Sequence, residues 1–168
     1  NRITSIPPNF GNLKKLQLLS LSENKIEKLP AKFSNLSNLI VLTMAGNGIT
    51  QFPEVLCDLP KLEKLDLSFN NISAIPAKCS NMKSLNSFYL SNNKFSQFPS
   101  VLTQMTWLFV LVLDDNKIQT LPKEIGNLKN LRYFHFANNG LIAIPPKIGD
   151  MTNLEYLFLN YNKITAIP

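Results

Sequence analysis

The stretch from Leu16 to Leu36 reads LQLLSLSENKIEKLPAKFSNL, and its pattern returns along the whole chain every 23 residues. The most regular member of the pattern is an asparagine, which stands at Asn1, Asn24, Asn47, Asn70, Asn93, Asn116, Asn139 and Asn162. A proline keeps the same interval from Pro7 to Pro168. A period of about 20 to 50 residues is typical of a solenoid, in which each unit stacks on its neighbours because it cannot bury its apolar face alone.

Each part of the pattern has a physical reading. Leu19 and Leu21 fall on one face of a short strand because strand side chains alternate with period two, and stacked strands then form a parallel sheet. The turn after the strand leaves buried backbone groups without sheet partners. An asparagine such as Asn24 carries both a donor and an acceptor, so a column of asparagines can satisfy them. We expect a proline such as Pro30 to open the return segment, where its fixed φ is tolerated.

The apolar frame resembles the leucine-rich repeat family in its 23-residue form, LxxLxLxxNxIxxLPxxIxxLxx, over the whole chain. The resemblance implies an α/β solenoid. Its curved horseshoe would carry a parallel β-sheet on the concave face and irregular, 3-10 or short helical segments on the convex face. We expect one domain over residues 1–168, with six complete repeats in 16–153 and partial repeats in 1–15 and 154–168. Neither end offers a polar capping unit, so we expect a fragment of a longer protein.

Residues for catalysis or metal binding are scarce, so we predict no enzyme, no cofactor and no metal site. The chain has one histidine, His135, no CxxC pair and no phosphate-cradling glycine loop. Asp114 and Asp115 are adjacent carboxylates. They indicate a site for a cation or a basic partner, or else a solvated acidic turn or a strand-end hydrogen-bonding device. Cys57 and Cys79 are interpreted as small buried side chains rather than a bridge, which favours a reducing, cytoplasmic location.

The outward strand positions are where the repeats differ. The pattern places one exposed aromatic and aliphatic patch on the later strands, with Phe109 at its edge and the acids Asp66 and Asp114 beside it. The patch consists of Tyr89, Val110, Val112, Tyr133, His135, Tyr156, Phe158 and Tyr161. Such a patch is typical of an interaction surface. The alternative is that these side chains serve cross-strand packing alone.

Charge narrows the class of partner. The net charge is +6 and the isoelectric point about 9.4, but the basic residues do not converge, which argues against nucleic acid. On the concave face acids outnumber bases, so the pattern favours a partner with basic charge. The lysines elsewhere are solvated or make a weak contact with anionic lipid. The longest apolar run, residues 107–113, is too short to span a bilayer.

We therefore predict a protein–protein interaction scaffold, acting in intracellular signalling. The repeats look like those of Ras-group and Ras-suppressor-like leucine-rich repeat proteins, which suggests a small GTPase or a signalling enzyme as partner. The alternative is the targeting arm of a multidomain enzyme: a kinase, protein phosphatase, cyclase, GTPase or ubiquitin ligase. A third class, extracellular recognition, would be indicated by a cysteine-rich cap. The sequence leaves the partner and the oligomeric state open.

Overall fold

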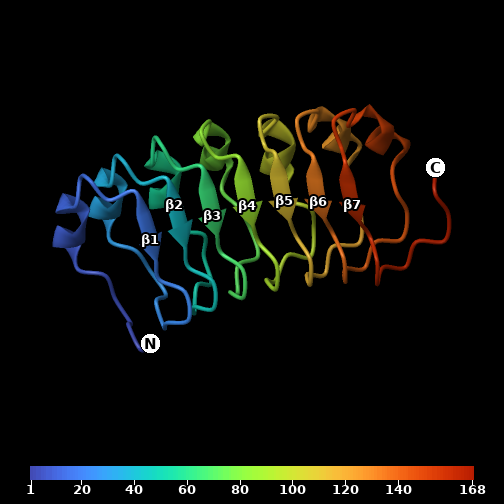
Figure 1. The fold of residues 1–168 in the computed structure, drawn as a ribbon. Coiled ribbons are helices and arrows are strands. Elements are labelled where there is room, and N and C mark those ends of the chain that lie inside the picture. Colours follow the sequence, from blue (N-terminus) through green and yellow to red (C-terminus); the bar gives the residue numbers. More distant parts are fainter.

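The computed structural model describes residues 1–168 as a single stack of repeats (Figure 1). Seven short strands form one parallel sheet in chain order, each in register with the strand one repeat away, so that Leu19 lies opposite Leu42 and Leu42 opposite Leu65. The strands are β1 (Leu18–Ser20), β2 (Val41–Thr43), β3 (Lys64–Asp66), β4 (Ser87–Tyr89), β5 (Val110–Val112), β6 (Tyr133–His135) and β7 (Tyr156–Phe158). This curved sheet confirms the predicted fold class.

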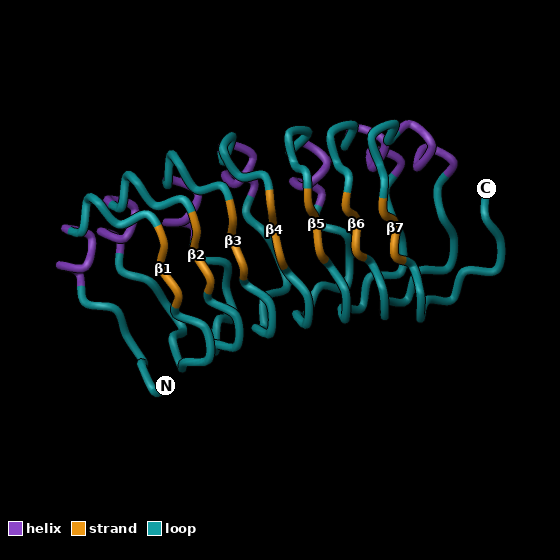
Figure 2. Tube along the Cα trace, viewed as in Figure 1, coloured by secondary structure: helices purple, strands orange, loops and turns teal.

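The return segments carry 3-10 helices, which run in a second row behind the strands (Figure 2). They are η1 (Pro8–Asn12), η2 (Ala31–Asn35), η3 (Glu54–Asp58), η4 (Ala77–Asn81), η5 (Ser100–Gln104), η6 (Lys123–Asn127) and η7 (Pro146–Asp150). A proline stands at the N-cap of every one, with φ between −64° and −73° and an extended ψ. Pro therefore opens each return segment, as predicted, at a place where its missing N–H costs little.

The core lies between the sheet and the 3-10 helices and contains 41 buried apolar residues in one cluster. The middle residue of a strand points inward, and Leu65, Phe88 and Leu111 are fully buried. The flanking residues of each strand point outward to the concave face. In β7, which has a strand on one side only, the middle residue Leu157 is 39% exposed. No helix in the structure has the length and apolar character needed to cross a membrane.

The asparagine column satisfies the turn backbone, as predicted. In Asn70 the side-chain Oδ1 accepts the backbone N–H of Ile49 at 3.1 Å. Its Nδ2 donates to the carbonyl oxygens of Met44, in the preceding repeat, and of Leu67 and Ser68, in its own. Each buried side-chain nitrogen or oxygen in the structure has a hydrogen-bond partner. The asparagines thus bind successive repeats together where the sheet ladder ends.

A second column of side-chain donors, on the chain just before each strand, was not anticipated from the sequence. Asn38, Asn130 and Asn153 each donate to a carbonyl 24 residues earlier, at 2.6 to 2.8 Å. Ser84 does the same, and in the next repeat Trp107 Nε1 donates to the carbonyl of Met82 at 3.0 Å. The column is hard to see in the sequence because asparagine, serine and tryptophan share a donor but little else.

In the asparagine column from Asn24 to Asn162, the residue before each asparagine has a left-handed backbone, with φ between 50° and 65°. The residues in this conformation are Glu23, Gly46, Phe69, Asn92, Asp115, Asn138 and Tyr161. Positive φ is uncommon for residues other than glycine, and rarest for bulky ones. The asparagine that follows the turn donates back across it to the residue just after its own strand, as Asn70 does to Leu67 and Asn93 to Leu90.

Candidate functional site

The outward side chains of β4 to β7 form two rows across the concave face. Register pairs Tyr89 with Val112, Val112 with His135 and His135 with Phe158. The second row pairs Val110 with Tyr133 and Tyr133 with Tyr156. Parallel strands lie about 4.8 Å apart, so neighbours in each row are in contact range. The structure therefore brings together seven of the residues that the sequence assigned to the patch.

The aromatic rings of the patch stack across the strands. The rings of Tyr133 and Tyr156 lie 4.7 Å apart and 5° from parallel, and His135 stacks on Phe158 at 4.2 Å. Phe109 was predicted at the edge of the patch, and its ring extends this stack by packing on Tyr133 at 5.8 Å. Tyr156 and Phe158 nevertheless remain 47% and 40% exposed. The result is an ordered aromatic surface that still faces solvent.

A hollow of about 390 Å³ opens within this surface. It is lined by Tyr89, Val110, Val112, Tyr133 and His135, all of which point outward from the sheet. The two valines come from β5, and the larger side chains come from the neighbouring strands β4 and β6. Small side chains between large ones thus create a recess of the size that one or two apolar side chains of a partner would fill.

Two basic side chains lie over aromatic rings of the patch or its edge. Lys64 Nζ lies 5.0 Å from the centre of the Tyr89 ring. Arg132 lies over the Phe109 ring at 4.9 Å and forms an ion pair of 3.0 Å with Glu155. Lys64, Arg132 and Glu155 were not assigned to the site from the sequence. They could have been predicted from the sequence, because they stand at outward strand positions next to aromatic residues, where a cation can lie over a ring.

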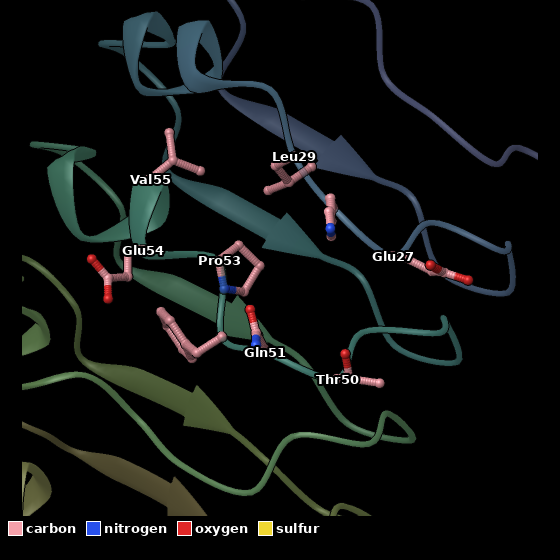
Figure 3. A pocket seen from close by; sticks show the side chains of 9 residues that line it. Glu27, Leu29, Thr50, Gln51, Pro53, Glu54 and Val55 are labelled. Carbon is pink, nitrogen blue, oxygen red and sulfur yellow. The ribbon is translucent and has the colours of Figure 1, made fainter.

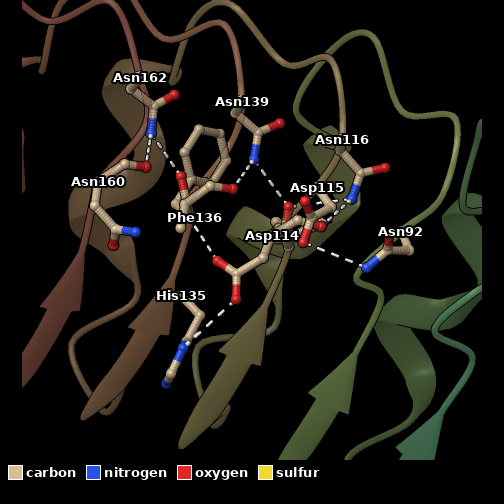
Figure 4. A network of polar contacts seen from close by, with 11 residues as sticks. Asn92, Asp114, Asp115, Asn116, His135, Phe136, Asn139, Asn160 and Asn162 are labelled. Carbon is tan, nitrogen blue, oxygen red and sulfur yellow. Dashed lines mark hydrogen bonds and ion pairs between the residues drawn. The ribbon is translucent and has the colours of Figure 1, made fainter.

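Asp114 is tied into the backbone at the end of β5 (Figure 4). Its Oδ1 accepts the N–H of Ala137 at 2.6 Å, and its Oδ2 lies 3.6 Å from His135 Nδ1. Burial raises the pKa of the Asp114 carboxyl, while the hydrogen bond from Ala137 and the nearby His135 act in the opposite direction. Asp114 is thus both a structural acceptor and the acid that meets the edge of the patch.

Asp115 faces away from the patch, toward the column of left-handed turns. Its carboxylate accepts hydrogen bonds from the side-chain amides of Asn92 (Figure 4) and of Asn138, in the two adjacent repeats. The geometry of both aspartates matches the strand-end hydrogen-bonding device that was one interpretation of the pair. No group of three or more histidine, cysteine, aspartate or glutamate side chains is placed to hold a metal ion.

Two predicted site residues lie outside the stacked surface. Asp66, at the end of β3, turns its Oδ1 to the N–H of Ser68 at 2.9 Å and lies beside Tyr89 in the row. Tyr161 occupies the left-handed turn after β7 and is 81% exposed. Phe69 has the equivalent place after β3 and is 59% exposed, although the sequence did not assign it to the site.

A larger hollow, of about 460 Å³, lies between the return segments of two successive repeats (Figure 3). It is lined by Glu27, Lys28, Leu29, Thr50, Gln51, Phe52, Pro53, Glu54 and Val55. A similar hollow follows between Phe52 and Ile75, and another between Ile75 and Phe98. These recesses recur because each return segment is separated from the next by the repeat spacing. The concave hollow, by contrast, depends on side chains that differ between repeats.

Comparison with known proteins agrees with this architecture. The family description "Leucine rich repeat" matches residues 1–49, 30–72 and 60–118, and "Leucine Rich repeats (2 copies)" matches residues 129–168. No curated protein matches the chain in sequence. Leucine-rich repeat domains are typically non-catalytic modules that mediate protein–protein interaction.

Among solved structures, an LRR protein of Leptospira interrogans is 30% identical, with a TM-score of 0.83 over 98% of this chain and 48% of its own. The plant peptide hormone receptor RGFR1, solved in complex with RGF2, is 36% identical, with a TM-score of 0.81 over 98% of this chain and 27% of the receptor. Internalin C2 of Listeria monocytogenes shares the fold at 23% identity, with a TM-score of 0.87 over 99% of this chain and 70% of its own. The chain thus spans about half and about a quarter of the first two proteins, and by its sequence, its repeat and its structure it belongs to the leucine-rich repeat family.

Proposed function

We propose that this chain is a non-catalytic binding module that holds a protein partner on its concave face. The observation that carries the proposal is the exposed hollow on β5, which stacked aromatic side chains flank and nothing in the chain fills. Cross-strand packing alone accounts for the Tyr133–Tyr156 stack but not for an apolar recess beside it. Aromatic residues around a recess are the usual anchors of an interface.

The charges around the hollow favour a partner with basic groups. Asp66 lies in the same row as Tyr89 and Asp114 lies beside His135 at the edge of the patch, while Arg132 is already paired with Glu155. A partner that inserts an apolar side chain between the valines would place a neighbouring Lys or Arg near Asp114. Electrostatic complementarity of this kind raises association rates and selects among partners.

The resemblance of the repeats to Ras-group proteins supports a role in cytoplasmic signalling, with a small GTPase or a signalling enzyme as partner. The two free thiols, Cys57 and Cys79, support a reducing compartment. A second candidate is an extended peptide as ligand; the 36% identity to the receptor solved with RGF2 favours it. Both candidates use the same surface, so one set of variants tests them.

The test replaces Val112 and, separately, Phe158 with glutamate and compares capture of partners from cell lysate by quantitative mass spectrometry. Each variant should capture at least about tenfold less partner than the wild-type chain, because a hot-spot residue contributes about 2 kcal/mol or more to the binding free energy. Thr43→Glu is the matched control, since Thr43 lies outward in the same row on β2 and contacts Ser20 rather than the patch. Full capture by both patch variants would refute a concave site. A drop in their melting temperature beyond that of the control would show that the replaced side chains serve packing.

A further inference from the structure

Cys57 and Cys79 lie on η3 and η4, which pack side by side in successive repeats. The other repeats carry small residues at the position of Cys57, namely Gly11, Ser34, Ser80, Thr103, Gly126 and Gly149. The glycines show where a side chain at this position points. A Cβ atom on Gly126 would stand 2.7 Å from the carbonyl oxygen of Lys147, in the next 3-10 helix, and one on Gly11 would stand 2.0 Å from that of Lys32. This position therefore faces the helix of the following repeat, 21 residues ahead.

For Cys57, the residue 21 positions ahead is Lys78, the direct neighbour of Cys79. The two cysteines therefore lie across the η3–η4 junction from each other, and each has the largest single effect on the pKa of the other. An ion pair of 2.7 Å between Lys78 and Asp58 joins the residues adjacent to the two cysteines and holds η3 and η4 together. Cys57 is 6% exposed and Cys79 is fully buried, and both are free thiols. No other junction between successive 3-10 helices has a cysteine on both sides.

The two thiols differ in their readiness to ionise. The hydrogen bond from Cys79 lowers the pKa of Cys57, and the Lys78 ammonium acts in the same direction against the cost of burial. The same hydrogen bond and burial raise the pKa of Cys79. Of the two thiols, Cys57 therefore loses its proton more readily than Cys79. Because the thiolate is the nucleophile in thiol–disulfide exchange, Cys57 is the first to react.

We propose that Cys57 and Cys79 form an oxidation site, which closes into a disulfide between η3 and η4 when a disulfide such as oxidised glutathione is present. The Cys57 thiolate attacks one sulfur of oxidised glutathione, so that a mixed disulfide forms and one glutathione thiolate leaves. Cys79 gives up its proton and its thiolate attacks the Cys57 sulfur, which releases the second glutathione. Two protein thiols are oxidised, one glutathione disulfide is reduced to two thiols, and the leaving thiolates take up the protons that the cysteines lost.

The bond would fix the distance between the return segments of adjacent repeats behind β3. The curvature of a solenoid follows from the small rotation between neighbouring repeats. A covalent link on the convex side sets that rotation at one junction, next to the strand that carries Asp66. Oxidation would thus act on the shape of the sheet on which the concave patch is built.

The test incubates the whole chain in glutathione buffers of increasing oxidised fraction, followed by denaturation, alkylation and peptide mapping. The folded wild-type chain should lose both free thiols and yield one Cys57–Cys79 cross-linked peptide that dithiothreitol reverses. The bond should form at a ratio of oxidised to reduced glutathione at least about tenfold lower than in urea, because the fold holds the thiols together. Equal ratios in the folded and unfolded chain would refute the site, and this comparison needs no variant.

Two single variants test the order of reaction. Cys79→Ser should stop at a glutathione adduct on Cys57, because the second thiol is missing. Cys57→Ser should leave Cys79 unmodified, because that thiol is buried and keeps its proton. Circular dichroism verifies that both variants are folded. A wild-type chain that retains glutathione on Cys57, or one in which both thiols survive conditions that modify Cys79→Ser, would overturn the proposal.

Discussion

The carboxylate of Asp114 accepts a hydrogen bond of 2.6 Å from the backbone N–H of Ala137, one repeat further along the chain. The hydroxyl of Ser22 does the same for Ala45, at 3.2 Å. Both acceptors stand just after a strand and both N–H groups just after the next strand. A side chain thus prolongs the contact between repeats beyond the end of the sheet ladder. Asp114 differs from Ser22 because its second oxygen is left to face His135.

Asp114→Asn keeps an acceptor for Ala137 and removes the partly buried charge. Because burial raises the pKa of Asp114, the folded chain holds its proton more tightly than the unfolded chain. This contribution to stability is present below the unfolded value of about 3.9 and is lost as the pH rises through the folded pKa. The wild-type chain should therefore gain stability relative to Asp114→Asn as the pH falls from neutral toward about 4. Urea unfolding at several pH values measures this difference, with Asp115→Asn as the control; the opposite slope would contradict the effect of burial.

Asn70→Ala should lower the free energy of unfolding by about 3 kcal/mol, because the buried N–H of Ile49 and the carbonyl of Met44 both lose their side-chain partner. Asn71→Ala is the matched control. Asn71 is the next residue and exposed, and its structural hydrogen bond comes from the backbone N–H. It should change stability by less than about 0.5 kcal/mol. Urea denaturation followed by circular dichroism compares the two. Equal effects would show that the column is not essential to stability.

Phe69 and Gly46 occupy equivalent left-handed turns, with φ of 55° and 65°. Phe69→Gly should raise the free energy of unfolding by up to about 1 kcal/mol, because a bulky residue is strained at positive φ. Gly46→Ala should lower it by about 1 kcal/mol for the same reason. Thermal unfolding of the two variants measures both changes. A loss of stability in Phe69→Gly would mean that its exposed ring makes a contribution larger than the backbone strain.

Gly126→Ala should destabilise the chain by about 1 to 3 kcal/mol, because the new methyl group would stand 2.7 Å from the backbone oxygen of Lys147 and force η6 and η7 apart. Gly149 is the equivalent residue one repeat later, and a Cβ atom there has no neighbour within 4 Å. Gly149→Ala should therefore be neutral or stabilising by less than about 1 kcal/mol. Chemical denaturation distinguishes the two. Similar losses of stability in both variants would show that the close approach of η6 and η7 does not cause the destabilisation.

The sequence determined most of the fold. Because the repeat has a constant length of 23 residues, equivalent residues of successive repeats lie side by side in the stack. The inward leucines, the outward row from Tyr89 to Phe158, the hydrogen bonds of Asn70 and the proline caps all follow from counting along the 23-residue unit. Periodicity could not choose among irregular, 3-10 and short helical return segments. It also missed the donors at Asn38 and Trp107, because unlike residues fill that column.

Only the tertiary structure decided how the variable side chains meet. The stack of Tyr133 on Tyr156, the hollow above Val110 and the acceptor role of Asp114 depend on rotamers and on the distance between strands, and neither is encoded in the period. The same holds for Cys57 and Cys79. They stand one residue out of step in the repeat, and the packing of η3 on η4 nevertheless places them across one junction from each other. Sequence assigns each residue to a face of the solenoid, and the spacing between repeats decides which residues on that face are in contact.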